Sequence, residues 1–240
     1  MTGLEGFSDW VLALLTRLFL YPGGVWLLVV LAGLRFACGG AATIRPTALA
    51  TVLLKSSLPA LSVAWAAISM LPLPGASALS APIDRLALTA LVLASLALDN
   101  HPDLREVAIS ASMALAVLSP LAQGDALLRE VRPWEVSSVL SMLCVAVALL
   151  VLSNKVVLSL PGAVRWLSWL GLGFAPVLAG WGGHLLPGIL GTSLVYATSI
   201  AILSTIGRLT SIHKPDKDWA IVTVAYGLAA LSLLAALLGY

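Results

Sequence analysis

The apolar residues of this chain form blocks about as long as a lipid bilayer is thick, and the charged residues lie at the ends of these blocks. A helix needs roughly 17 to 25 apolar residues to cross the hydrocarbon of a bilayer, which is about 30 Å thick. Hydrophobic residues make up 60% of the chain and charged residues only 10%, whereas a water-soluble domain carries about 25% charged residues. The pattern therefore predicts an all-α fold, a polytopic bundle of transmembrane helices.

About eight blocks of this length can be placed along the chain. They cover residues 18–37, 48–73, 83–98, 105–121, 134–152, 163–181, 185–206 and 219–238. Residues 7–20 precede the first block as an amphipathic stretch, which lies at the membrane interface or enters the bilayer with a kink at Pro22. We expect one integral membrane domain over residues 1–240, with residues 1–20 as the candidate interfacial segment.

The basic residues predict which side of the membrane each loop faces, because short cytoplasmic loops carry an excess of Lys and Arg. With eight spans, the odd-numbered loops and their borders hold most of them: Arg35, Arg45, Arg105, Lys155, Arg165, Arg208, Lys214 and Lys217. Both chain ends are then non-cytoplasmic. The formal net charge of +2, spread over several loops, argues against a nucleic-acid partner.

The cysteines and histidines are not spaced as metal or haem ligands. Cys38 and Cys144 stand alone and are expected to be small packing residues. A membrane haem takes imidazoles from within helices, whereas the histidines fall in predicted loops. They are His101, His184 and His213. No nucleophile has a base at usable spacing, so the sequence predicts no catalytic, cofactor-binding or metal site in this chain.

Lys55 is the clearest charge inside a predicted span, roughly two turns from its start. Ionisable residues within a membrane are expensive and often mark an ion path. A long side chain can also reach the interface or pair with a neighbouring group. Lys55 is therefore a candidate for an intramembrane charge on an ion path, with snorkelling or pairing as the alternative.

Small residues are abundant in the sixth and seventh blocks. In lipid they allow helix backbones to approach closely and gain van der Waals contact. The glycines expected to pack helices, within the bundle or against a partner subunit, include Gly171, Gly173, Gly180 and Gly183.

Four short fragments follow one another along the chain. Residues 17–24 read Arg-Leu-Phe-Leu-Tyr-Pro-Gly-Gly, residues 105–108 Arg-Glu-Val-Ala, residues 154–163 Asn-Lys-Val-Val-Leu-Ser-Leu-Pro-Gly-Ala, and residues 207–209 Gly-Arg-Leu. In this order they resemble the membrane-anchor family shared by respiratory complex I and the membrane-bound hydrogenases, which includes formate hydrogenlyase subunit 4. The resemblance implies about eight spans with outward-facing ends.

The chain departs from that family where the family couples redox chemistry to protons. The family's first cytoplasmic loop is rich in arginines, of which Arg35 and Arg45 remain. Its fifth-to-sixth loop carries carboxylates where this chain has Leu158, Ser159 and Gly162. Because such residues cannot bind a proton, we expect a reduced relative that keeps the helix bundle and lacks its own proton path.

The resemblance implies a non-catalytic structural or accessory subunit of a multi-subunit energy-converting redox complex in a prokaryotic cytoplasmic (inner) membrane. Its partners would be other membrane subunits, a peripheral redox arm and the lipid bilayer, with redox cofactors in those subunits and none in this chain. The residues expected to dock partners are Arg35, Arg45, Arg105, Glu106, Asn154, Lys155, Arg208 and Lys214. The alternative is a stand-alone small-solute or ion transporter or channel, with Lys55 and residues 180–191 along a pathway between interrupted helices.

Overall fold

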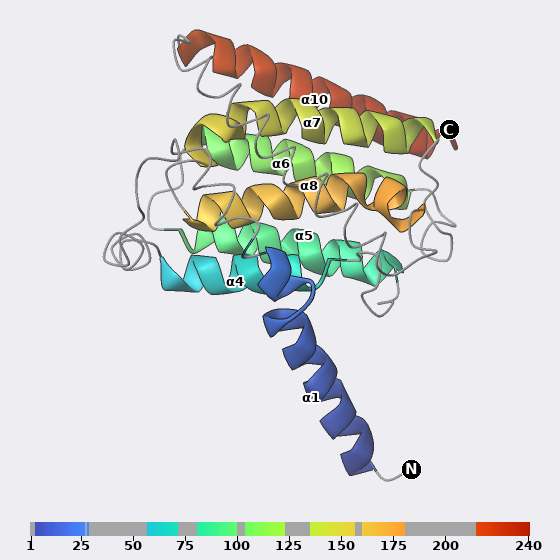
Figure 1. The fold of residues 1–240 in the computed structure, drawn as a ribbon. Helices are drawn as coiled ribbons and strands as arrows, with labels where there is room; N and C mark the ends of the chain where they lie inside the picture. Colours follow the sequence, from blue (N-terminus) through green and yellow to red (C-terminus); the bar gives the residue numbers. More distant parts are fainter. Residues whose placement is uncertain are drawn as a thin grey trace.

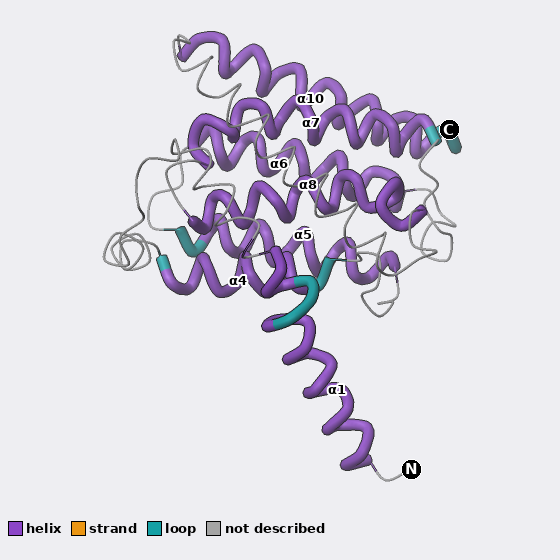
Figure 2. Tube along the Cα trace, viewed as in Figure 1, coloured by secondary structure: helices purple, strands orange, loops and turns teal. Residues whose placement is uncertain are grey.

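The computed structural model describes residues 3–26, 28, 57–71, 81–99, 104–122, 135–156, 160–180 and 215–240. Regular structure in these residues is helical throughout (Figure 2), which confirms the all-α prediction for the described part of the chain. The helices are α1 (Gly3–Phe19), α4 (Leu58–Ser69), α5 (Ala81–Ala97), α6 (Leu104–Leu118), the short 3-10 helix η1 (Ser119–Ala122), α7 (Val136–Val156), α8 (Leu160–Gly180) and α10 (Pro215–Leu237).

Most of the predicted apolar blocks correspond to described helices. The blocks at residues 83–98, 105–121, 134–152, 163–181 and 219–238 hold α5, α6 with η1, α7, α8 and α10. The block at residues 185–206 lies outside the described residues. Within the described part, two stretches are long and apolar enough to cross a membrane, Leu104–Ala122 and Trp219–Leu237. Because a buried helix of a water-soluble protein has the same length and composition, the number of spans stays a prediction.

The connection between the predicted blocks at residues 134–152 and 163–181 is shorter than the sequence predicts, and this is a correction. α7 continues past Asn154 and Lys155, and α8 begins at Leu160. Pro161 is compatible with this start, because the N–H that proline lacks has no partner within the first turn of a helix. The polar residues and the proline therefore marked a helix boundary, but the prediction made the loop too long.

The bundle helices form two groups of three. α6, α7 and α10 contact one another, and so do α4, α5 and α8. In Figure 1 the first group occupies the upper half of the bundle and the second group the lower half. α6 and α7 contact α8, and α6 contacts α5, along the boundary between the groups, which we call the seam.

Small side chains allow close packing inside each group. Ala60, Ala64 and Ala67 of α4 are fully or almost fully buried, and so are Ala225 and Ala229 of α10. Side chains of this size bring helix backbones close enough for extensive van der Waals contact, which is the main attraction between helices in lipid.

Across the seam, α8 meets α7 at two points. A Cβ atom on Gly173 would lie 2.8 to 2.9 Å from three carbons of Val145, so only glycine fits there without a shift. About two turns earlier along α8, Trp166 Nε1 donates a hydrogen bond to Leu149 O at 3.2 Å. α7 and α8 are thus joined by one close backbone approach and one buried hydrogen bond.

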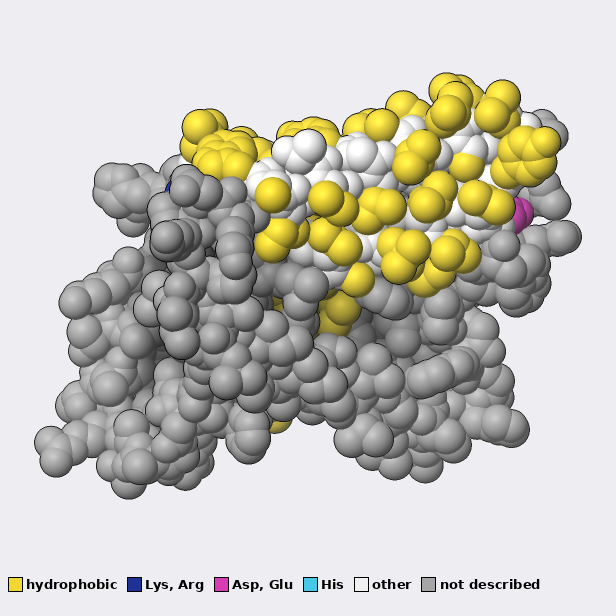
Figure 3. Space-filling model, turned by 90° about the horizontal axis from the view of Figure 1, so that it is seen from above, with side chains coloured by type: hydrophobic (Ala, Val, Ile, Leu, Met, Phe, Trp, Pro, Cys, Tyr) yellow, Lys and Arg dark blue, Asp and Glu magenta, His cyan; other side chains and the backbone are white. Residues whose placement is uncertain are grey.

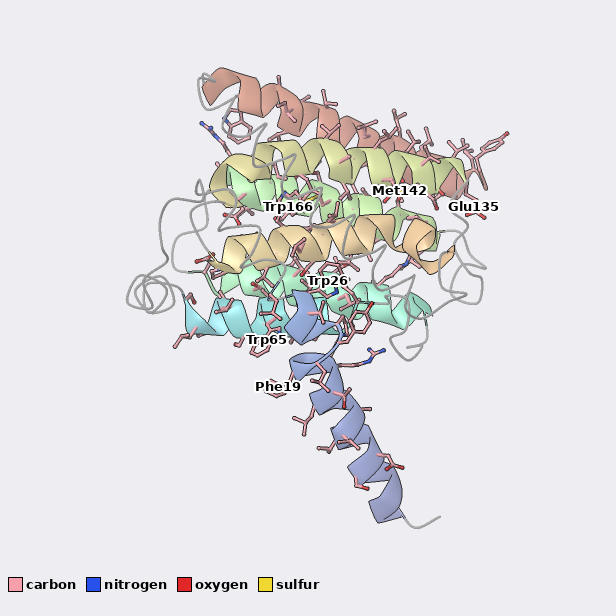
Figure 4. All side chains as sticks on the ribbon, viewed as in Figure 1. Phe19, Trp26, Trp65, Glu135, Met142 and Trp166 are labelled. Carbon is pink, nitrogen blue, oxygen red and sulfur yellow. The ribbon has the colours of Figure 1, made fainter. Side chains whose placement is uncertain are left out.

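α1 leaves the bundle and points away from it (Figure 1). The helix ends at Phe19, and after a turn at residues 20–22 the chain becomes helical again at Gly23. The ring of Phe19 packs edge-on against Trp65 of α4, with centroids 5.6 Å apart (Figure 4). The chain bends at the turn that contains Pro22, and the interfacial position of α1 stays a prediction.

Glycine is needed on the inner side of this bend. A Cβ on Gly23 would collide with Ser69 Oγ of α4, and a Cβ on Gly24 would collide with the main-chain oxygen of Phe19. Gly23 therefore lets the chain pass close to α4, and Gly24 lets it fold back against the end of α1. The chain then enters the bundle, where Trp26 is fully buried.

Candidate functional site

An ion cluster lies at one end of the bundle, where Arg165 of α8 meets two carboxylates. Arg165 Nη2 donates to Asp99 Oδ2 and to Glu106 Oε1, each at 2.7 Å. Its Nη1 donates to Ser95 O at 3.4 Å. Because both carboxylate oxygens contact the same nitrogen, they lie no farther apart than twice that 2.7 Å distance.

The cluster is largely removed from solvent. The Arg165 side chain keeps 5% of its exposure, while those of Asp99 and Glu106 keep 23% and 16%. A buried charge is tolerated when it is paired and its hydrogen bonds are satisfied. Bonds between ionised partners are also shorter and stronger than neutral ones. The two carboxylates therefore hold the guanidinium in place, and the arrangement can fix three helices at one point.

Helix direction brings these residues together. Asp99 follows the end of α5, Glu106 lies in the first turn of α6, and Arg165 lies near the start of α8. From the sequence these charges were expected at the ends of spans and in loops, and their pairing was not predicted. Hydropathy locates helix ends along a chain, but it does not determine which ends meet.

Two serine hydroxyls join α4 to α5 beside the cluster. Ser57, the N-cap of α4, accepts a hydrogen bond from Ala60 N and donates one to Leu98 O at 2.8 Å. Ser95 Oγ donates to Ala60 O at 2.7 Å. Since Ser95 also accepts from Arg165, the ion cluster and the α4–α5 contact share one residue.

A second polar cluster lies at the opposite end of the bundle and contains hydroxyl groups. Ser232 Oγ of α10 donates to Ser137 O of α7 at 2.7 Å, and its hydroxyl also bonds that of Ser119 in η1. Ser137 N donates to the main-chain oxygen of Tyr240 at 3.3 Å. These contacts hold the ends of α6 and α10 against the start of α7, away from the ion cluster.

Cys144 lies between these two clusters as a buried free thiol. Its Sγ lies 3.2 Å from Ala225 O of α10 and 3.8 Å from Ser112 O of α6, in donor geometry. The described residues contain no group of three His, Cys, Asp or Glu side chains able to hold a metal ion. In the described structure, Cys144 packs α7 against two neighbouring helices.

The remaining predicted site residues are only partly described. Arg105 is half-buried in the first turn of α6. Gly171 is buried within α8, and Gly180 ends that helix. Six further predicted residues lie outside the described residues, so their roles stay predictions: Arg35, Arg45, Lys55, Gly183, Arg208 and Lys214. The docking role predicted for Glu106 also stays a prediction, although its carboxylate contacts Arg165.

From residue 219 to the end of the chain, the outer face of α10 is apolar (Figure 3). Residues 219–240 contain no charged side chain. The large exposed side chains are Trp219, Val224, Tyr226, Leu231, Leu234, Leu237, Leu238 and Tyr240. A contiguous apolar surface of this kind marks contact with a membrane or another protein.

Comparisons with protein-family models, with curated proteins and with solved structures find no match to this chain.

Proposed function

We propose that this chain is a membrane-embedded structural subunit of a multi-subunit energy-converting redox complex, of the complex I-like or membrane-bound hydrogenase-like kind. The observation that carries the proposal is the outer face of α10, where large apolar side chains are exposed along residues 219–240, a stretch without a charged side chain. If it were exposed to water, such a face would promote aggregation. Lipid chains or the helices of another membrane subunit can cover it without burying a charged group.

The proposed topology has about eight spans, with both chain ends on the non-cytoplasmic side. In support, Tyr240 lies beside the start of α7. The ion cluster lies near the other end of α7, next to Leu149 and Trp166. The cluster then lies at the cytoplasmic end, as expected where basic residues accumulate.

A structural role is supported by the way the described charges are used. Arg165 forms ion pairs with both Asp99 and Glu106, and these pairs fix three helices at one point. In addition, α1 extends from the bundle with Leu12, Leu15 and Phe19 exposed, a surface suited to other membrane components. The redox class of the complex comes from the order of the four sequence fragments, and the first of them forms the bend that directs α1 outward.

The proposal is tested by extracting the tagged full chain from its native membrane in a mild detergent, followed by size analysis and mass spectrometry of the particle. A structural subunit co-purifies with iron–sulfur or hydrogenase-like large subunits and further membrane subunits. A homogeneous particle of this chain alone overturns the proposal and favours a stand-alone transporter or channel. Reporter fusions at the two chain ends test the topology separately.

A further inference from the structure

We propose that the Glu106–Arg165 ion pair is a latch between the two helix groups. It closes the seam at the cluster end, and when it breaks the groups separate there while the Gly173–Val145 contact serves as the pivot. This inference concerns movement within the chain and does not depend on which complex the chain joins.

Each helix group carries its own polar contacts. In the α4–α5–α8 group, Ser57 and Ser95 join α4 to α5, and Asp99 joins α5 to α8. In the α6–α7–α10 group, Ser232 joins α10 to α7 and to η1. Each group therefore keeps its internal contacts when the seam opens.

The polar contacts across the seam lie at the cluster end. Among the described residues, the hydrogen bonds that cross it are those of Glu106 with Arg165 and of Trp166 with Leu149. Both lie near the start of α8, at the cluster end. Farther along α8, the seam contact at Gly173 is with the side chain of Val145 and is purely apolar.

The two carboxylates differ in the helix group to which they belong. Asp99 belongs to the same helix group as Arg165, whereas Glu106 belongs to the other group. Loss of the Glu106 charge therefore removes this tie between α6 and α8 but leaves Arg165 paired with Asp99. This asymmetry makes opening possible without exposing an unpaired buried guanidinium, which would be strongly unfavourable.

The pivot follows from the close approach of α8 to Val145. Neither helix can move nearer to the other at Gly173, because the space is already filled. Helices at subunit interfaces shift by about 1–2 Å, and we expect a movement of this size across the seam. Because the contact lies well inside both helices, rotation about it opens the charged end of the seam without drawing the opposite ends apart.

The test measures two distances by pulsed electron paramagnetic resonance on the full chain in lipid nanodiscs. The parent has Cys38 and Cys144 replaced by Ala. One spin-label pair at Leu58 and Leu104 spans the seam at the cluster end, and a second pair at Leu86 and Val139 spans the groups at the other end. All four native side chains are exposed, so that labels there do not disturb the core.

Glu106→Gln should lengthen the 58–104 distance by about 2 Å or broaden its distribution, with no lengthening of the 86–139 distance. The matched control, Asp99→Asn, removes a carboxylate from the same guanidinium but should keep the parent distances. An unchanged 58–104 distance in Glu106→Gln overturns the latch, as does an equal change in Asp99→Asn. If Glu106→Gln gives no monodisperse protein, Glu106→Asp must show a smaller displacement in the same direction, and parent distances in that variant overturn the proposal.

Discussion

Glu106 Oε1 and Arg165 Nη2 lie 2.7 Å apart, although 59 positions separate the two residues in the chain. The contact links α6 to α8, and Asp99 approaches the same nitrogen from the end of α5. A single buried guanidinium thus fixes three helices at one end of the bundle. Each carboxylate pairs with the guanidinium, and an unpaired charge in a water-poor interior is strongly unfavourable.

Arg165→Ala should destabilise the protein by about 3–5 kcal/mol, since it removes the guanidinium that pairs with two partly buried carboxylates. Denaturant titration of the purified protein in detergent, followed by circular dichroism, measures this loss. A change below about 0.5 kcal/mol, which is typical of a surface substitution, would show that the cluster does not support the fold.

The triple variant Asp99→Asn, Glu106→Gln, Arg165→Met should be markedly more stable than Arg165→Ala, although it lacks three charged groups. Replacing a whole buried ion cluster by neutral groups removes the desolvation cost together with the attraction, and is often close to neutral. The same titration compares the two proteins. Equal destabilisation would mean that packing of the arginine stem, and not its charge, is what matters.

Gly173→Ala should cost about 1–3 kcal/mol, because its Cβ would lie 2.8 to 2.9 Å from carbons of Val145 and the helices must shift. Gly227→Ala in α10 is the control, since no atom lies within 4 Å of a Cβ built there. That variant should be neutral or more stable by about 0.5–1 kcal/mol, as expected for replacing glycine inside a helix. Equal effects at the two glycines would contradict the close approach of α8 to α7.

The sequence predicted the helices better than the contacts between them. Apolar blocks of membrane-spanning length located α5, α6, α7, α8 and α10, because a long apolar helix is a property of consecutive residues. The pairing of Glu106 with Arg165 was missed, since it depends on which helix ends lie side by side. Composition marked Gly173 as a small residue, but only the fold identifies Val145 as the side chain that fills the space.

The Ser119–Ser232 hydroxyl pair should show measurable coupling in a double-mutant cycle with alanine. Both side chains are buried, and Ser232 also donates to Ser137 O. Couplings between polar groups in membrane proteins average about 0.6 kcal/mol, with a maximum near 1.7 kcal/mol. Ser62→Ala is the control, because the Ser62 hydroxyl is exposed and bonds only to Pro59 O in its own helix. If the stability changes of the two single substitutions were strictly additive, the two hydroxyl groups would not be in contact.

Cys144 should resist thiol reagents in the folded protein, because its side chain is fully buried between α6, α7 and α10. In a Cys38→Ala background, a fluorescent maleimide should label Cys144 only after unfolding in SDS. Both states are read from one gel, so the unfolded sample confirms that the reagent is active. Stoichiometric labelling of the folded protein would contradict the packing of these three helices.

The most direct test of the membrane account is the accessibility of a spin label at Leu231, on the exposed face of α10, in protein reconstituted into nanodiscs. Molecular oxygen concentrates in the bilayer, whereas a water-soluble nickel chelate does not enter it. The account predicts frequent collisions with oxygen and few with nickel at Leu231, and the reverse for a label in an aqueous loop of the same protein. Free access of nickel to Leu231 would contradict a lipid-facing α10.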